Sequence, residues 1–261
     1  MSPFSIASYG VTVSISVANA ALLEAVTRIA PDALPGSKLE HGEAARFCYS
    51  LAETGSGVAV RRGGRNLISE HDRAAAVRRL CSDIRLKVAA AASSPVFIHA
   101  GVVGWKGRAI VLPGRTFAGK STLVASLLRL GATYLSDEFA LLGAGGLVYP
   151  YPCKLHIRSG QGHGDQLISP SCFGALVGVE PLPVGLLLFL KYRPEGDWRV
   201  RTLSPGIAAL GLLRNAVAAR MYPAETLQAS ALVAAQAPAF RGQRGDAQAA
   251  AEEILTMCDN Y

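Results

Sequence analysis

The chain has 261 residues, of which half are hydrophobic and 17% are charged, and its formal net charge is +7 at pH 7. This length allows one or two folded domains, and the balance of apolar and charged residues excludes an intrinsically disordered chain. The basic residues are dispersed rather than gathered into a stripe interleaved with aromatic residues, so a nucleic-acid partner is not expected.

The longest apolar run, residues 184–190, is too short to cross a bilayer and predicts a central strand buried on both faces. The five cysteines are odd in number and scattered, and none is in C-x-x-C spacing. The first residues lack the basic start and apolar core of a signal peptide. Together these observations predict a cytoplasmic protein with no membrane partner.

The first third of the chain predicts a small α/β module over residues 1–94. Strands are expected at residues 10–16, 46–51, 57–60 and 65–68, and helices at residues 20–30 and about 70–92. Asn19 and Ser69 are the expected N-caps of the two helices, and residues 31–38 are expected to form a loop. The run Ser93-Ser94-Pro95 marks the boundary to a second domain, residues 95–261. No motif in this module indicates a chemistry.

The second domain begins with two strands, predicted at residues 96–103 and 108–112, that lead into a glycine-rich segment, residues 114–122. Its spacing, G-x-x-x-x-G-K-[ST], is that of a phosphate-binding loop. Gly114 and Gly119 allow backbone N–H groups to surround an anion. Lys120 adds a positive charge for the β- and γ-phosphates, and the Ser121 hydroxyl can ligate Mg²⁺.

The context of this segment has the order that such a loop requires, with a buried strand before it and a helix after it. The helix is expected to end at Gly131, and its N-terminus directs a positive dipole at the same anion. The segment therefore predicts binding of a nucleotide with Mg²⁺, and the alternative is a glycine-rich turn with a solvated lysine. The candidate nucleotide-binding residues are Gly114, Arg115, Thr116, Phe117, Ala118, Gly119, Lys120, Ser121 and Thr122.

An acidic pair, Asp137 and Glu138, follows the next predicted strand. A strand that returns after a crossover helix usually lies near the first strand and parallel to it, which brings its carboxyl end beside the loop. Carboxylates there can hold Mg²⁺ and accept a proton from an attacking hydroxyl. The alternative is a polar turn between two strands. The short distance from Lys120 argues against a transport or remodelling ATPase.

The residues of this region resemble the catalytic domain of the HPr kinase/phosphorylase family, a P-loop fold similar to phosphoenolpyruvate carboxykinase. The resemblance rests on three stretches in the same order: Ile98-His99-Ala100-Gly101, the glycine-rich segment, and Ser136-Asp137-Glu138. Residues 148–152 resemble a segment of kinase-related members outside the true HPr enzymes. The later Glu-x-Arg-Gly-type signature of the true enzymes is not found, which favours such a related subfamily.

The resemblance implies an α/β fold in which a P-loop kinase domain of the HPr kinase/phosphoenolpyruvate carboxykinase type follows the small α/β module. It implies that Lys120 and the loop backbone bind the triphosphate, with Ser121, Asp137 and Glu138 at the metal. Asp137 would be the base acting on a serine hydroxyl. His99 would lie near the reacting phosphate, although a strand histidine with a satisfied hydrogen bond is the alternative reading.

The implied activity is ATP-dependent, Mg²⁺-assisted phosphorylation of a serine on a small protein or peptide. The alternatives are an ATP-binding regulatory module without transferase activity and a P-loop ATPase. The sequence leaves open the identity of the acceptor, a phosphorylase activity, ATP or pyrophosphate as donor, and assembly into a homo-oligomer.

Overall fold

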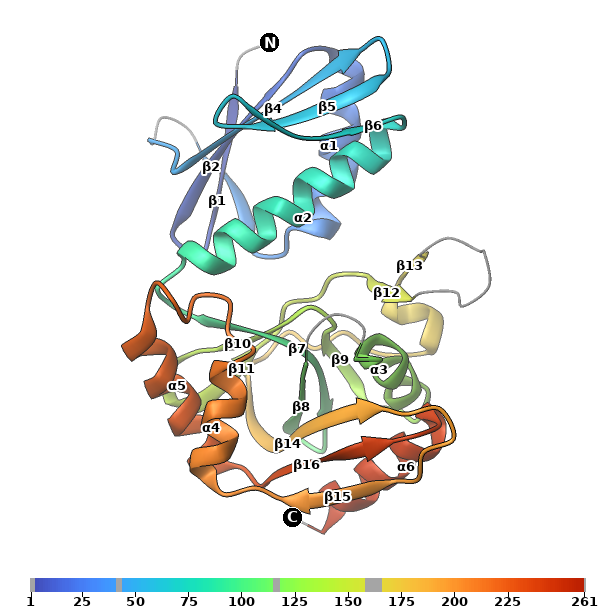
Figure 1. Ribbon diagram of the computed structural model, residues 1–261. Helices are drawn as coiled ribbons and strands as arrows, with labels where there is room; N and C mark the ends of the chain where they lie inside the picture. Colours follow the sequence, from blue (N-terminus) through green and yellow to red (C-terminus); the bar gives the residue numbers. More distant parts are fainter. Residues whose placement is uncertain (1–2, 41–43, 115–117, 158–165, 261) are drawn as a thin grey trace. The chain divides into compact units, whose positions relative to one another are not determined.

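The computed structural model describes residues 3–40, 44–114, 118–157 and 166–260. The chain divides into two compact units, Met1–Ala92 and Ser93–Tyr261. Each unit is a mixed α/β structure in which helices pack on a β-sheet (Figure 1). In the described part of the chain, no helix combines the length and the apolar character needed to cross a membrane.

The first unit is built on a six-stranded sheet in the order β3-β1-β2-β4-β5-β6, in which only β2 and β4 pair in parallel. Helices α1 and α2 pack on each other and on β2, and α2 also packs on β5. The elements are β1 (Phe4–Ser8), β2 (Val11–Val17), α1 (Ala20–Ala33), β3 (Ser37–Glu40), β4 (Phe47–Thr54), β5 (Gly57–Arg62), β6 (Arg65–Glu70) and α2 (Arg73–Ala91).

Two local predictions in this unit were wrong. The expected loop at residues 31–38 is confined to residues 34–36, because α1 continues through Pro31 to Ala33 and β3 begins at Ser37. Packing explains the longer helix, because Leu34 at its C-cap is buried in the core. The cap of α2 is Asp72 rather than Ser69, and its carboxylate accepts the Ala75 N–H at 2.8 Å. Ser69 is engaged in the β5–β6 ladder, which delays the start of the helix.

The second unit contains an eight-stranded sheet in the order β11-β10-β7-β8-β14-β16-β15, with β9 also paired to β7. A separate pair joins β12 to β13. The strands are β7 (Val96–Trp105), β8 (Arg108–Pro113), β9 (Thr133–Ser136), β10 (Phe139–Leu142), β11 (Leu147–Tyr149), β12 (Leu155–Ile157), β13 (Gln166–Ile168), β14 (Leu182–Tyr192), β15 (Arg199–Thr202) and β16 (Ala239–Arg244). The helices are α3 (Lys120–Arg129), α4 (Pro205–Leu213), α5 (Pro223–Gln236) and α6 (Ala247–Asp259), with 3₁₀ turns η1 (Ala144–Gly146) and η2 (Pro170–Phe173).

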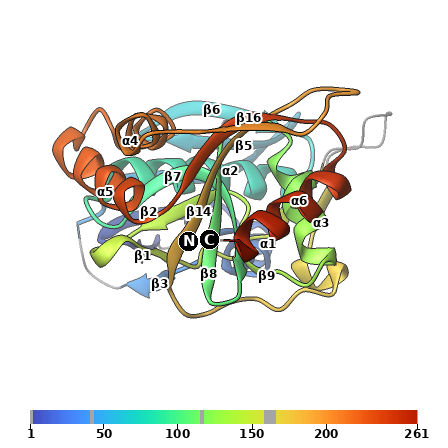
Figure 2. The same ribbon diagram turned by 90° about the horizontal axis from the view of Figure 1, so that it is seen from below.

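Helices cover both faces of this sheet. Leu212 of α4 and Val233 of α5 join one apolar cluster with Leu187 of the sheet. Leu127 of α3 and Ile254 of α6 join another on the opposite face. Figure 2 shows α4 and α5 on one side of the unit and α3 and α6 on the other. The core therefore consists of two apolar layers with the sheet between them.

Four strands of this sheet, β8, β9, β14 and β16, place their carboxyl ends at one edge. β14 pairs in parallel with β8 on one side and with β16 on the other, which confirms the predicted central strand. The returning strand β9 runs in the direction of β8, but β7 lies between them because it pairs antiparallel with both. The end of β8, where the glycine-rich segment starts, thus lies at the same edge as the ends of β9, β14 and β16.

Candidate functional site

The glycine-rich segment connects the end of β8 to the start of α3. Its first residue, Gly114, donates its N–H to the carbonyl of His99 at 3.0 Å. Gly119 has φ +74°, a left-handed conformation that glycine adopts without strain, and it is the N-cap of α3. Because glycine has no side chain to cap the helix, the first N–H groups of α3 are left to bind another acceptor.

The structure describes six of the nine predicted nucleotide-binding residues. Gly114, Ala118, Gly119, Lys120 and Ser121 are half-buried around this turn, and Thr122 is exposed on the first turn of α3. The predicted residues Arg115, Thr116 and Phe117 lie outside the described residues.

A buried arginine at the carboxyl end of β16 contacts the segment. Arg244, the last residue of β16, is only 3% exposed. It donates through Nη2 to the carbonyl of Gly119 at 2.7 Å and through Nη1 to the carbonyl of Gly245 at 2.8 Å. Its guanidinium also lies 5.2 Å from the ring centroid of Tyr192, and burial lowers its pKa. Nothing in the sequence indicated this residue, which follows Gly119 by 125 positions.

Asp137 follows β9 directly and is 7% exposed. Its Oδ2 accepts the backbone N–H of His156 at 3.3 Å. Its Oδ1 is buried and has no hydrogen-bond partner among the described residues. A β-carbon built at Gly101 of β7 would lie 3.9 Å from this Oδ1 and 2.6 Å from Cγ2 of Val124 in α3. Gly101 therefore lets α3 approach β7 closely, with the carboxyl of Asp137 close by.

The electrostatic surroundings of Asp137 show which predicted residues lie near it. Burial raises the pKa of Asp137 to about 7. A hydrogen bond from the Ser121 hydroxyl, the N–H of His156 and the charge of Lys120 lower this pKa, and the charge of Glu138 raises it further. The carboxyl of Asp137 therefore lies near Lys120 and Ser121, and the backbone of β7 contacts both Gly114 and Glu138.

The turn that carries the acidic pair is fixed by Ser136. Its buried hydroxyl oxygen accepts the N–H of Glu138 at 3.2 Å and that of Phe139 at 3.1 Å. The carbonyl of Glu138 accepts the N–H of Ala100 at 3.3 Å. The half-buried Glu138 is therefore held at a defined position between β9 and β10. The polar-turn alternative describes this backbone correctly, but it leaves the buried, unpaired carboxylate oxygen of Asp137 unexplained.

His99 lies on β7 next to the start of the glycine-rich segment. Its carbonyl accepts the Gly114 N–H, and its own N–H donates to the carbonyl of Asn215 at 2.8 Å. Its ring centroid is 5.0 Å from that of Phe139, its cross-strand neighbour on β10. The backbone of His99 thus connects the segment to the sheet, and its ring is part of an aromatic cluster.

The side chains of Asp137 and Ser121 fit a magnesium ion that is bound by the protein and by phosphates together. Among the described residues, no group of three or more histidine, cysteine, aspartate or glutamate side chains could hold a metal ion without other ligands. Mg²⁺ is usually bound by one or two carboxylates together with substrate phosphates. The buried Oδ1 of Asp137 is an unpaired acceptor of the right chemistry, and the Ser121 hydroxyl lies next to the same carboxyl.

Comparison with solved structures finds a distant structural similarity. No family model matches the chain, and no curated protein matches it. Among solved structures, the chain is similar to the HPr(Ser) kinase/phosphatase from Coxiella burnetii, with 18% sequence identity, coverage of 63% of this chain and 94% of that chain, and a TM-score of 0.37. The function is therefore inferred from the residues and geometry of the site.

Proposed function

We propose that residues 95–261 form a P-loop kinase domain, related to HPr kinase, that transfers the γ-phosphoryl group of ATP to a serine hydroxyl of a small protein or peptide. One observation carries this proposal: a buried carboxylate, with one oxygen unpaired, lies beside the lysine and serine of a phosphate-binding loop motif. A structural turn has no need for this arrangement, because burying an unpaired carboxylate is unfavourable.

The binding step uses the backbone and the charges of the glycine-rich segment. The N–H groups at the start of α3 and the Lys120 ammonium bind the phosphates, and the hydrogen bond from Arg244 to the Gly119 carbonyl keeps the turn in position. Ser121, Asp137 and Glu138 are the residues that would hold Mg²⁺. When bound, Mg²⁺ neutralises negative charge on the phosphates and so favours attack by an oxygen nucleophile.

In the transfer step, the Asp137 carboxylate accepts the proton of the serine hydroxyl. The serine oxygen forms a bond to the γ-phosphorus, and the bond from that phosphorus to the β-γ bridging oxygen breaks, so ADP leaves with the electron pair. A base is most effective when its pKa lies near the working pH, and the pKa of Asp137 is about 7. His99, whose carbonyl accepts the Gly114 N–H from the neighbouring strand, is the residue we assign near the reacting phosphate.

Replacing Lys120 by alanine tests this site. We expect transfer of labelled phosphate from γ-labelled ATP to candidate serine peptides to fall at least about 100-fold, because a charge that pairs with phosphate is removed. The matched control is Lys106→Ala, which removes an exposed lysine that pairs with Asp259 at 2.7 Å in the same unit. Transfer that survives Lys120→Ala would mean that the assigned site is wrong.

The same assay separates the two alternative functions. A regulatory module would bind ATP with Mg²⁺ but transfer no label, and its nucleotide turnover would be indifferent to Asp137→Asn. An ATPase would release labelled inorganic phosphate without labelling any serine, and its hydrolysis would increase with a partner or on oligomerisation.

A further inference from the structure

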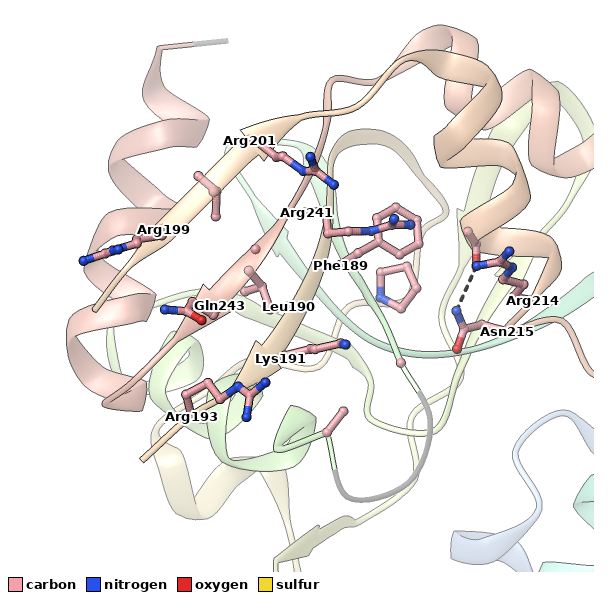
Figure 3. Close-up of a pocket in the computed structure, with 16 residues that line it drawn as sticks. Phe189, Leu190, Lys191, Arg193, Arg199, Arg201, Arg214, Asn215, Arg241 and Gln243 are labelled. Atoms are coloured by element: carbon pink, nitrogen blue, oxygen red, sulfur yellow. Dashed lines mark hydrogen bonds between the residues drawn. The ribbon is translucent and has the colours of Figure 1, made fainter. Parts of the chain in front are cut away.

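A cavity of about 820 Å³ opens beside the glycine-rich segment, with Gly114 and Ala118 on its wall. It lies over the carboxyl-terminal halves of β14 and β16, the neighbouring strand β15 and the end of α4. Figure 3 shows the side chains that line it. Since both strands end at the edge of the sheet that carries the candidate site, a ligand in this cavity would lie next to that site.

The strand register gathers positive charge on one face of this cavity. Phe189 of β14 is paired with Arg241 of β16, which is paired with Arg201 of β15. Two residues further along β14, Lys191 lies on the same face because side chains alternate along a strand. Arg214 follows α4 on the opposite wall. We call Lys191, Arg201, Arg214 and Arg241 the basic groove.

The side chains of the basic groove converge. Figure 3 shows Lys191, Arg241 and Arg201 extending from three neighbouring strands toward the side where Arg214 lies. Arg199 also lines the cavity, but it points the other way and pairs with Asp197 at 3.1 Å. The guanidinium of Arg241 lies 6.0 Å from the ring centroid of Phe189, which keeps it close to the sheet.

Within the described part of the chain, no carboxylate lines the cavity or pairs with a residue of the basic groove. Four like charges on one face repel each other, so an anionic ligand that approaches them is attracted and relieves the repulsion. The basic groove therefore selects a ligand with several negative charges.

From this geometry we infer that the basic groove binds an acidic segment of the acceptor polypeptide, next to the serine that is phosphorylated. This inference rests on the proposed kinase function. Lys191, Arg201 and Arg214 are exposed, whereas a small-anion site usually encloses its ligand among convergent buried groups. Neighbouring strands are about 5 Å apart, and alternate residues of one strand about 7 Å apart. Arg201 and Arg241 are cross-strand partners, and Lys191 is displaced from them by two residues along β14, so an extended segment that carries several carboxylates can contact all three cations.

The test is direct binding of labelled peptides in the absence of nucleotide, measured by fluorescence anisotropy on the full chain. One peptide carries a serine flanked by aspartate and glutamate, and its control carries asparagine and glutamine at those positions. We expect the acidic peptide to bind more tightly. Arg201→Gln and Arg241→Gln are each expected to weaken its binding about 2- to 5-fold, as for exposed ion pairs, and together by roughly 10-fold.

Arg220→Gln is the matched control, because it removes an exposed arginine of the same unit that does not line the cavity, and we expect it to leave peptide affinity unchanged. Arg201→Lys and Arg241→Lys should recover most of the binding, which separates a charge effect from misfolding. Equal binding of acidic and neutral peptides would overturn the inference. The inference would also be overturned if the glutamine variants weakened the binding of ATP but not that of the acidic peptide. It would likewise be overturned if the protein bound inorganic tripolyphosphate but did not bind the acidic peptide.

Binding and transfer can fail independently. If the acidic peptide binds with the expected sensitivity to the variants but no label is transferred to any serine, the kinase proposal fails while the groove assignment holds. If label reaches acidic and neutral serine peptides equally and the variants change nothing, the groove assignment fails while the kinase proposal holds.

Discussion

Replacing Asp137 by asparagine is expected to make the protein more stable above pH 7 while it abolishes phosphoryl transfer. The pKa of this carboxyl is raised from 3.8 to about 7, mainly by burial. Between these two pH values the folded state holds a proton that the unfolded state has lost, so stability falls as the pH rises through this range. A shift of about 3 units corresponds to about 4 kcal/mol at pH 8, and asparagine removes this penalty without a change of shape.

Urea unfolding at pH 5 and pH 8 measures the effect. We expect Asp137→Asn to raise the free energy of unfolding by about 2–4 kcal/mol at pH 8, and by less at pH 5. Asp259→Asn is the contrasting control, because hydrogen bonds from Lys106 and Trp105 lower the pKa of Asp259. Its substitution should lower stability at neutral pH. A less stable Asp137→Asn protein at pH 8 would show that the carboxylate is well solvated or paired.

The same variant tests the role of Asp137 in transfer. A general base contributes about 10²- to 10⁴-fold to the rate, and we expect the turnover number to fall by that factor. A variant that is stabilised and still fully active would rule out this residue as the base. Gain of stability with loss of activity is the expected signature of a functional buried charge.

Replacing Arg244 by methionine is expected to loosen the glycine-rich segment. Methionine fills most of the volume but removes the side-chain donor to both carbonyls, so the Gly119 carbonyl keeps the Leu123 N–H at 3.2 Å and the Gly245 carbonyl loses the donor from Arg244. An orphaned buried carbonyl is unfavourable by about 1–3 kcal/mol, although removing a buried charge offsets part of this. We expect a net loss of about 1–3 kcal/mol in the free energy of unfolding. The affinity for a fluorescent ATP analogue should fall about tenfold or more, because the turn that supplies the N–H groups is no longer held.

Arg244→Lys distinguishes positioning from general destabilisation. Lysine keeps the charge and reaches one carbonyl, so it should recover part of the nucleotide affinity. If both variants bind the ATP analogue as tightly as the unchanged chain, while stability falls, Arg244 has a structural role only. Nucleotide affinity is therefore the deciding measurement.

The part of the site that could be predicted from the sequence is local. The glycine-rich segment, the strand before it, the helix after it and the acidic pair are contained in about 35 consecutive residues, and their spacing carries the information. The caps show the limit of local reasoning: Asn19 caps α1 as expected, whereas the pairing of β6 with β5 moved the cap of α2 from Ser69 to Asp72.

The rest of the site depends on contacts between distant parts of the chain. Arg244 reaches Gly119 because β16 lies two strands from β8, and the N–H of His156 reaches Asp137 from a separate strand. The basic groove exists only because the register aligns Arg241 with Arg201. Dispersed arginines in the sequence indicate a solvated surface, and only the sheet order brings them together.

Strand β7 joins the two halves of the candidate site through its backbone. At His99 its carbonyl accepts the first N–H of the glycine-rich segment, and at Ala100 its N–H donates to the carbonyl of Glu138. One peptide unit of β7 therefore sets the spacing between the start of the glycine-rich segment and the turn that carries the acidic pair. Because these hydrogen bonds use backbone atoms, a change of side chain at His99 alone would leave both of them in place.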